Sequence, residues 1–416
     1  MDEKYQENCT TSILDLPTEV LLKIFHMVDV ETAHKSLYNV CQRFRIILDD
    51  QIFWKQYFYN LYGKKSHMVS YVSDDEIDWH NILYESNHRE TQWTNYSDNF
   101  RSFLLHTVHY APVDSIHLME NGSLVVSGSR DRGIALCNLS YARRVPEDAH
   151  LIDLSHVLLK PDAHGGWVWS IKSVDRDLYT GSWDNTIKVW SLDNGSVQQK
   201  CQFNGQQAVL SLSAKETLLA AGLWGKQIKL FDVRVGLECI HQYHIHNRAV
   251  LDVIIYGNYI ISASEDRTVG IYDQRAQKKI TNIPIRPPTK VIQGETNNNS
   301  MPLKICCKPN VIYVGDTKGM MHVIHPKLFK QMAKFEVTNE KVTGVAYETG
   351  MLATISTDNR IRISRPVNPI LHYADFESNV STPVSLDYYN DVMAVGGTNS
   401  VQVWIPKNST ILHPTI

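Results

Sequence analysis

Apolar residues follow a helical period near the N-terminus of the chain. The apolar residues form three stripes, and within each stripe they are separated by about three, four or seven residues, as on the buried face of an amphipathic helix. Pro17 suits the first turn of a helix, where its missing N–H is not needed. We therefore predict about three short helices between Leu16 and Phe58. The stripes consist of Val20, Leu21, Ile24, Phe25 and Val28, then Leu37, Val40, Cys41 and Phe44, then Trp54 and Phe58.

A strand–turn–strand pattern replaces the helical one after residue 102 and continues to the C-terminus. One apolar residue follows each tight turn, and the separations between successive examples are 53, 41, 41, 51, 41 and 40 residues. A period of about 40–45 residues is typical of a four-stranded propeller blade. Seven units predict an all-β ring of seven blades. The marker residues are Ile134, Ile187, Ile228, Val269, Met320, Ile361 and Val401.

Closure of such a ring poses a physical problem, because an open ring leaves unpaired strand edges. The last unit ends near Ile405, and the 11 residues after it are too few for a well-formed fourth strand. Residues 103–108 precede the first unit and have strand character. We predict that they supply the outer strand of the last blade. The two longer spacings predict loop insertions near 141–160 and 283–300.

Between the two patterns lies an aromatic connector, with a predicted helix over 78–92. Gly and Ser, which dominate flexible linkers, are too few here. The predicted organisation is a disordered tail at 1–12, a helical module at 13–59, a helical connector at 60–102, the propeller at 103–406 and a tail at 407–416.

Composition narrows the function classes. Hydrophobic content of 43% and charged content of 20% are ordinary for a globular protein. A formal net charge of −3 gives no global attraction to nucleic acid or to an anionic membrane. Seven scattered cysteines favour a reducing compartment over a disulfide framework. No stretch has the pattern of a signal peptide or of a membrane span. We expect a cytoplasmic and/or nuclear protein.

The order of residues in the helical segment adds a resemblance. Leu16-Pro17-Thr18-Glu19-Val20-Leu21-Leu22, then Ile24-Phe25, then Val40-Cys41-Gln42-Arg43-Phe44 and finally Phe53-Trp54 resemble the F-box. The stretch 31–35 and Phe44 depart from the usual F-box pattern. The resemblance implies docking on a Skp-type adaptor, which links to a cullin-RING scaffold. The implied adaptor-binding residues are Leu16, Pro17, Glu19, Leu21, Leu22, Ile24, Phe25, Val40, Cys41 and Trp54. The alternative is a helical cap with a purely structural role.

The repeats resemble WD repeats, most clearly from His164 to Trp190. The family pattern implies that Asp184 holds His164, that His164 bonds Thr180 or Ser182, and that this hydroxyl reaches Trp190. The same residue types could be interpreted as a hydrolase triad, but we favour the structural interpretation.

Other candidate chemistry is weak. His244 and His246, and Cys306 and Cys307, have metal-ligand side chains, but neither pair has a second pair at zinc spacing. The chain contains no phosphate-binding loop motif and no RING-like cysteine array. We therefore expect no catalytic residues, no metal and no cofactor.

The WD resemblance also indicates which residues face one rim of the central channel. The predicted substrate-binding residues are Asp114, Arg130, Trp169, Trp183, Trp224, Glu265 and Lys304. Family members that bind phosphorylated peptides place several Arg on this rim to pair with phosphate. Here Arg130 stands nearly alone, and Trp side chains on adjacent blades suggest an aromatic binding patch. The alternative is that Trp167, Trp169 and Trp183 pack in the channel wall.

Together these features predict a small all-α F-box module followed by an all-β seven-bladed WD-repeat propeller. The resemblance implies a non-catalytic substrate-recognition subunit of an SCF (Skp-cullin-F-box) ubiquitin ligase. Its partners would be a Skp-type adaptor, the cullin-RING scaffold and an unidentified protein substrate. The alternative is a WD-repeat scaffold that assembles proteins without ubiquitin transfer.

Overall fold

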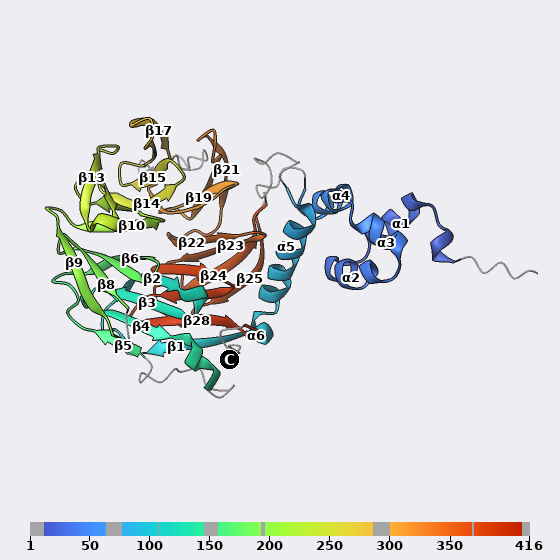
Figure 1. Ribbon diagram of the computed structural model, residues 1–416, viewed down its shortest axis with the longest axis horizontal. Helices are drawn as coiled ribbons and strands as arrows, with labels where there is room; N and C mark the ends of the chain where they lie inside the picture. Colours follow the sequence, from blue (N-terminus) through green and yellow to red (C-terminus); the bar gives the residue numbers. More distant parts are fainter. Residues whose placement is uncertain are drawn as a thin grey trace, which may run out of the picture.

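The computed structural model describes residues 12–63, 77–106, 108–144, 157–192, 196–285, 300–367 and 370–409. Helices at the N-terminal end are followed by seven four-stranded sheets arranged as the blades of a propeller (Figure 1). The tails were predicted at 1–12 and 407–416, and residues 1–11 and 410–416 of them lie outside the described residues. None of the helices in the described ranges is both long and apolar enough to cross a membrane.

A compact hydrophobic core holds the N-terminal module together. Leu21, Phe25, Trp54 and Phe58 are at most 1% exposed, so each contributes about 1.5–3 kcal/mol by burial. The Phe25 and Phe44 rings meet edge to face, with centroids 4.8 Å apart. The helices of this module are α1 (Thr18–Phe25), α2 (Val30–Lys35), α3 (Gln42–Leu48) and α4 (Gln51–Tyr62), with 3₁₀ turns at Ile13–Asp15 and Leu37–Asn39.

The structure corrects the second predicted stripe, from Leu37 to Phe44, which is not one helix. Cys41 has an extended backbone (φ −158°, ψ 166°) and occupies the N-cap position of α3, so a 3₁₀ turn and a helix replace the single element. The stretch that departs from the F-box pattern forms α2. The carboxylate of Asp29 caps this helix by accepting the backbone N–H of Thr32 at 2.8 Å.

The connector helix expected over 78–92 is confirmed as α5 (Trp79–Thr94), and a short helix α6 (Tyr96–Asn99) follows it. Asp78 caps α5 by accepting the backbone N–H of Asn81 at 3.1 Å. This helix runs along the side of the propeller and contacts β23 and β25 of the sixth blade, whereas α1–α3 project away from the ring (Figure 1).

Each blade contains four antiparallel strands, and the first strand of each lies innermost. In blades 1 to 3 the strands are β2 (Val113–Met119), β3 (Leu124–Ser129), β4 (Ile134–Asn138) and β5 (Val157–Lys160); β6 (Val168–Val174), β7 (Asp177–Ser182), β8 (Thr186–Ser191) and β9 (Gln198–Asn204); and β10 (Val209–Lys215), β11 (Leu218–Leu223), β12 (Ile228–Asp232) and β13 (Glu238–Tyr243).

Blades 4 to 6 repeat this arrangement, and the seventh includes the first strand of the chain. Their strands are β14 (Val250–Tyr256), β15 (Tyr259–Ser264), β16 (Thr268–Asp273) and β17 (Lys278–Pro284); β18 (Pro302–Lys308), β19 (Val311–Asp316), β20 (Met320–Ile324) and β21 (Gln331–Glu336); β22 (Val342–Glu348), β23 (Met351–Ser356), β24 (Arg360–Arg365) and β25 (Leu371–Glu377); and β26 (Ser385–Tyr389), β27 (Val392–Gly396), β28 (Ser400–Pro406) and β1 (Phe100–His106).

The predicted closure of the ring is confirmed. Strand β1 pairs antiparallel with β28, from Phe100 opposite Pro406 to His106 opposite Ser400. The strand begins three residues earlier than predicted. Phe103 on β1 is fully buried in the same hydrophobic cluster as Val403 on β28, so the contact combines backbone pairing with apolar burial.

The two predicted insertions lie partly outside the described residues, at 145–156 and 286–299. Where the structure describes the first, the loop prediction is wrong, because residues 157–160 form β5, the outer strand of blade 1, and 141–144 belong to a 3₁₀ turn (Leu139–Arg144). At the second, residues 283–284 still belong to β17, and residues 285 and 300 lie outside any helix or strand. The long insertion before β5 hid this four-residue strand.

Candidate functional site

The polar set predicted in blade 2 is buried and closed. Nδ1 of His164 lies 3.0 Å from a carboxylate oxygen of Asp184, and Nε2 lies 2.6 Å from the hydroxyl of Thr180. The indole N–H of Trp190 donates to the same hydroxyl at 2.8 Å. Thr180 is therefore the partner, and Ser182 instead accepts the backbone N–H of Asp184. The set ties three parts of one blade together.

Its electrostatics fit this structural role. Burial lowers the pKa of His164, although Asp184 opposes the shift. Burial alone would raise the pKa of Asp184, but hydrogen bonds from His164 and Thr186 lower it well below its usual range. A neutral imidazole donates to the carboxylate and accepts from Thr180. Because the Thr180 hydroxyl is fully buried, a substrate cannot reach it.

Other blades repeat or replace this set. In blade 4, His246 lies 3.0 Å from Asp266 and 2.7 Å from the hydroxyl of Ser262. His109 makes the equivalent contacts in blade 1. His246 is thus engaged in a blade contact and belongs to no cluster of three or more metal-ligating side chains in the described residues.

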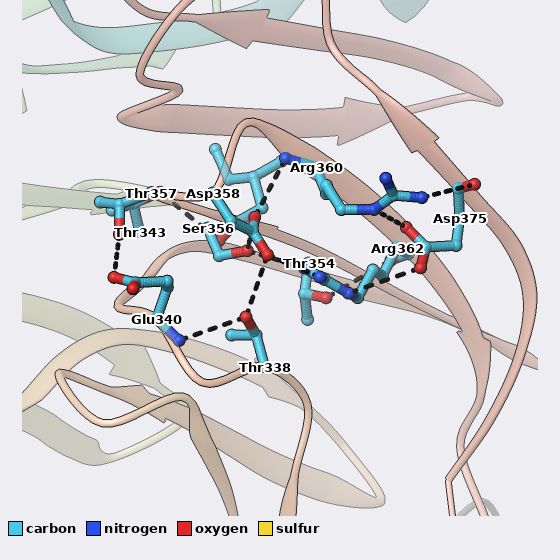
Figure 2. A network of polar contacts seen from close by, with 11 residues as sticks. Thr338, Glu340, Thr343, Thr354, Ser356, Thr357, Asp358, Arg360, Arg362 and Asp375 are labelled. Atoms are coloured by element: carbon cyan, nitrogen blue, oxygen red, sulfur yellow. Dashed lines mark hydrogen bonds and ion pairs between the residues drawn. The ribbon is translucent and has the colours of Figure 1, made fainter.

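Blade 6 replaces histidine with threonine and arginine (Figure 2). Thr338 donates to Asp358 at 3.1 Å, and Arg362 donates to Asp358 at 2.6 Å and to the Ser356 hydroxyl at 2.8 Å. Burial would raise the pKa of Asp358, but Arg362 and Ser356 hold it down, at about 2. The guanidinium is committed to this internal network and is not available to a ligand.

A central cavity of about 440 Å³ is lined by the inner strands of all seven blades. Polar side chains on these strands join neighbouring blades. Ser170 accepts the backbone N–H of Leu212, and Asp252 accepts that of Ile305, at 2.9 and 2.8 Å. Burial raises the pKa of Asp252, and Lys304 opposes this shift. We interpret the channel wall as the joint between blades.

A β-bulge near the start of most inner strands positions the rim residues. The register of β2 shifts at Asp114, that of β6 at Trp169 and that of β18 at Leu303. A bulge adds one residue to one strand and re-aims its side chain. Lys304 therefore does not occupy the position predicted for it. It pairs with Gly315, one residue beyond the bulge, and lines the channel wall.

The predicted residues of blade 1 form an ion pair. Arg130 donates to both carboxylate oxygens of Asp114, at 2.8 and 3.0 Å. The side chain of Asp114 is 2% exposed, and that of Arg130 is 35% exposed. Burial raises the pKa of Asp114, although Arg130 lowers it in part. The Arg130 guanidinium lies 5.0 Å from the Trp167 ring centre and 5.5 Å from that of Trp169.

Four indole rings continue from this ion pair across blades 2 and 3. Trp169 and Trp183 have ring centres 5.6 Å apart, and Trp183 and Trp224 meet edge to face at 5.3 Å. Trp167 lies 6.0 Å from both Trp169 and Trp183. Trp167, Trp183 and Trp224 are 41%, 39% and 50% exposed. We call Trp167, Trp169, Trp183 and Trp224 the Trp patch.

The Trp patch includes both a side chain that packs in the channel wall and side chains that are exposed for binding. Trp169 packs against the buried cluster of Ala208, Leu210 and Ala249 from the next two blades, as a wall residue does. Trp183 and Trp224 keep 39% and 50% of their surface exposed. Trp167 was absent from the predicted binding set, although it lies two residues before Trp169, the spacing at which strand side chains share a face. Glu265 occupies on blade 4 the position that Trp224 has on blade 3. The backbone N–H of Glu265 donates to the carbonyl of Ala249, and that of Trp224 donates to the equivalent carbonyl of Ala208.

The predicted adaptor-binding residues divide into two groups. Leu21, Phe25 and Trp54 are buried in the module core, so they shape the surface without forming it. Pro17, Glu19 and Val40 are exposed, and Leu16, Leu22, Ile24 and Cys41 are half-buried. The exposed surface also contains apolar residues that the sequence did not single out, namely Met27, Ile46 and Ile52, which are 87%, 64% and 62% exposed.

Comparison with protein families finds both modules. An F-box-like model matches residues 13–60, and the WD domain, G-beta repeat model matches residues 155–191 and 237–273. These matches agree with the helical module and the propeller seen in the structure.

Two curated relatives share this combination in their names. F-box/WD repeat-containing protein 9 of Bos taurus is 29% identical over 398 residues, covering 94% of this chain and 82% of the relative. F-box/WD repeat-containing protein mec-15 of Caenorhabditis elegans is 30% identical over 278 residues, covering 64% and 66%. The crystal structure of the WD40 propeller domain of Doa1 covers 72% of this chain and 94% of its own, with a TM-score of 0.57 and 17% identity, which supports the fold.

Proposed function

We propose that this chain, an F-box/WD-repeat protein, is the substrate-recognition subunit of an SCF-type ubiquitin ligase. The N-terminal module would dock a Skp-type adaptor, and the Trp patch would bind a protein substrate. No catalytic family is indicated by the comparisons. The chain would therefore contribute by positioning one protein near another rather than by chemistry of its own.

The observation that carries this proposal is the exposed apolar surface of a module whose core is already complete. Met27, Val40, Ile46 and Ile52 are each more than 60% exposed, although α1–α4 bury a full set of aromatic residues. Four large apolar side chains left in solvent on one small module support a protein-binding surface, because exposed apolar patches mark such surfaces. A purely structural cap would bury such residues against the propeller, from which α1–α3 stand clear (Figure 1).

The connector supports a positioning role because it is fixed to the ring. Arg365 of blade 6 donates to both carboxylate oxygens of Glu90 on α5, at 2.5 and 3.1 Å. Arg89 of α5 donates to the carbonyl of Thr349 at 2.9 Å. Helix α5 therefore holds the module at a set distance from the propeller.

The test is co-purification of the intact chain with a Skp-type adaptor and a cullin. Substitution of two exposed residues, Val40→Asp with Met27→Asp, places charge on the docking surface without entering the core. We expect stoichiometric adaptor binding by the wild-type chain and at least a tenfold loss in the variant, because an unpaired charge buried in an interface costs more than 1.4 kcal/mol.

Val235→Asp provides a matched control, since Val235 is as exposed as Val40 (61%) but lies in the propeller. This control should bind like the wild type. A folded wild-type chain that fails to bind the adaptor would refute the proposal and favour a scaffold without ubiquitin transfer.

A further inference from the structure

We propose that the open end of the Trp patch binds an arginine side chain of the substrate. The guanidinium would stack on Trp183 and Trp224 and pair with Glu265. This inference rests on the proposed function, because it names the chemistry by which the receptor recognises its substrate. It also excludes a phosphorylated peptide as the principal ligand of this surface.

The first argument comes from Arg130, which already shows that the patch accommodates a guanidinium. Its charge centre lies 5.0 and 5.5 Å from the ring centres of Trp167 and Trp169, within the range of a cation–π contact. The same side chain makes a bidentate ion pair with Asp114. At this rim an arginine side chain is therefore held by two contacts, stacking on indole rings and an ion pair with a carboxylate.

The second argument is that the other end of the patch has the same elements but no cation. Trp183 and Trp224 are 39% and 50% exposed, and no Lys or Arg of the described residues lies over either ring. Trp is the best aromatic face for a cation. Glu265 follows Trp224 at the equivalent rim position of blade 4. A ligand arginine would find here exposed indole rings and a rim carboxylate, the two kinds of group that hold Arg130.

The third argument is the charge balance of the predicted rim residues. Arg130 is neutralised by Asp114, and the charge of Lys304 acts on the buried carboxylates of Asp114 and Asp252. Glu265 is half-buried and makes none of the ion pairs found in the described part of the chain. Glu265 is therefore the acidic member of this set without an ion-pair partner in the described residues, which favours a cationic ligand over phosphate at its end of the patch.

The test uses the full-length chain and an N-acetylated pentapeptide amide, Gly-Ser-Arg-Ser-Gly. The nine Trp side chains are labelled with ¹⁵N, and their indole N–H signals are followed during titration. Single Trp→Leu variants assign the signals of Trp183 and Trp224. We expect these two signals to shift saturably, and the neutral citrulline peptide to bind about two- to fivefold more weakly, as the loss of a cation–π contact at an exposed site predicts.

Glu265→Gln should weaken the arginine peptide by a similar factor and should leave the citrulline peptide unaffected. Glu238→Gln, at an exposed acidic residue on the outer strand β13, serves as the matched control and should change neither. These substitutions avoid the hydrophobic core, and circular dichroism verifies the fold.

Equal binding of the arginine and citrulline peptides, or no shift of the Trp183 and Trp224 signals, would overturn the inference. Stronger binding of a lysine or phosphoserine peptide at these signals would assign the patch to another ligand and overturn it too. Adaptor binding is measured separately, so loss of the arginine contact leaves the receptor proposal standing. Conversely, failed adaptor binding with intact peptide shifts would refute only the receptor proposal.

Discussion

His164, Asp184 and Trp190 hold blade 2 together through one closed hydrogen-bonded set that includes Thr180. The types and order of His164, Asp184 and Trp190 were enough to predict their hydrogen-bonded set, because WD repeats place these residues at fixed positions. The choice between Thr180 and Ser182 stayed open, since residues two apart on a strand share a face. The structure selects Thr180. Lys304 was misplaced by one residue because β18 begins with Pro302 where β2 and β6 begin with valine, so Leu303 was taken as the leading apolar residue.

At this scale we predict that His164 makes the free energy of unfolding depend on pH. Burial places its folded-state pKa below the ordinary 6.5. The unfolded chain therefore takes up the proton first, and the stabilisation present above pH 6.5 is lost as the pH falls toward the folded-state pKa. His164→Gln should destabilise the chain by about 1–3 kcal/mol at pH 7.5 and flatten the decline between pH 7.5 and 5.5. Urea unfolding at the two pH values measures both effects.

Thr180→Val is the control, because it breaks the same network without removing a titrating group. It should lower the stability but retain the decline of the wild type. Identical pH dependence in the wild type and His164→Gln would show that burial of this imidazole does not control the acid sensitivity.

Among the elements, long periodic segments were predictable and short irregular ones were not. Helix α5 was anticipated from its apolar spacing, and α2 was missed because its six residues carry too few apolar positions to show a period. The sequence also gave no indication of where α5 would dock. That contact depends on Gly350, whose backbone has φ +80°, and on the close approach of Ser86 to it.

We predict that Gly350→Ala loosens α5 from the propeller. A Cβ at this position would lie 2.4 Å from the Cα of Ser86, and the left-handed backbone adds a cost of about 1–2 kcal/mol. Amide hydrogen exchange in α5 should accelerate by about five- to thirtyfold, while the inner strands keep their protection. Gly257→Ala is matched in backbone conformation, with φ +55° and no atom within 4 Å of the added Cβ. Equal exchange in the two variants would contradict the docking role.

The whole molecule places the two proposed binding surfaces on separate modules, which α5 joins through its contacts with the propeller. The blade number and the closing strand followed from the repeat spacing, because a ring of open edges is unstable and the chain offers one spare strand. The docking of α5 on blade 6 could not be predicted, since it depends on contacts between residues far apart in the sequence, such as Glu90 with Arg365, which are 275 positions apart.

Since the two surfaces lie on different modules, we predict that each can be disabled alone. Trp183→Ala with Trp224→Ala should abolish substrate capture, because it removes the exposed indole rings, and adaptor binding should be unchanged. Cross-linking followed by mass spectrometry of proteins recovered with the wild-type and variant complexes gives the comparison. Unchanged capture by a folded double variant would exclude the Trp patch as the substrate surface.

The pairing of β1 with β28 determines when the seventh blade can form during translation. His106 leaves the ribosome roughly 300 residues before its partner Ser400, and at about 5–20 residues per second this interval lasts about 15–60 s. During that time β1 has no partner, and the seventh blade cannot form. The N-terminal module precedes this strand, so its surface is complete in sequence while the ring is still being translated. Under the proposed function, nascent chains would then bind the adaptor before they can bind a substrate.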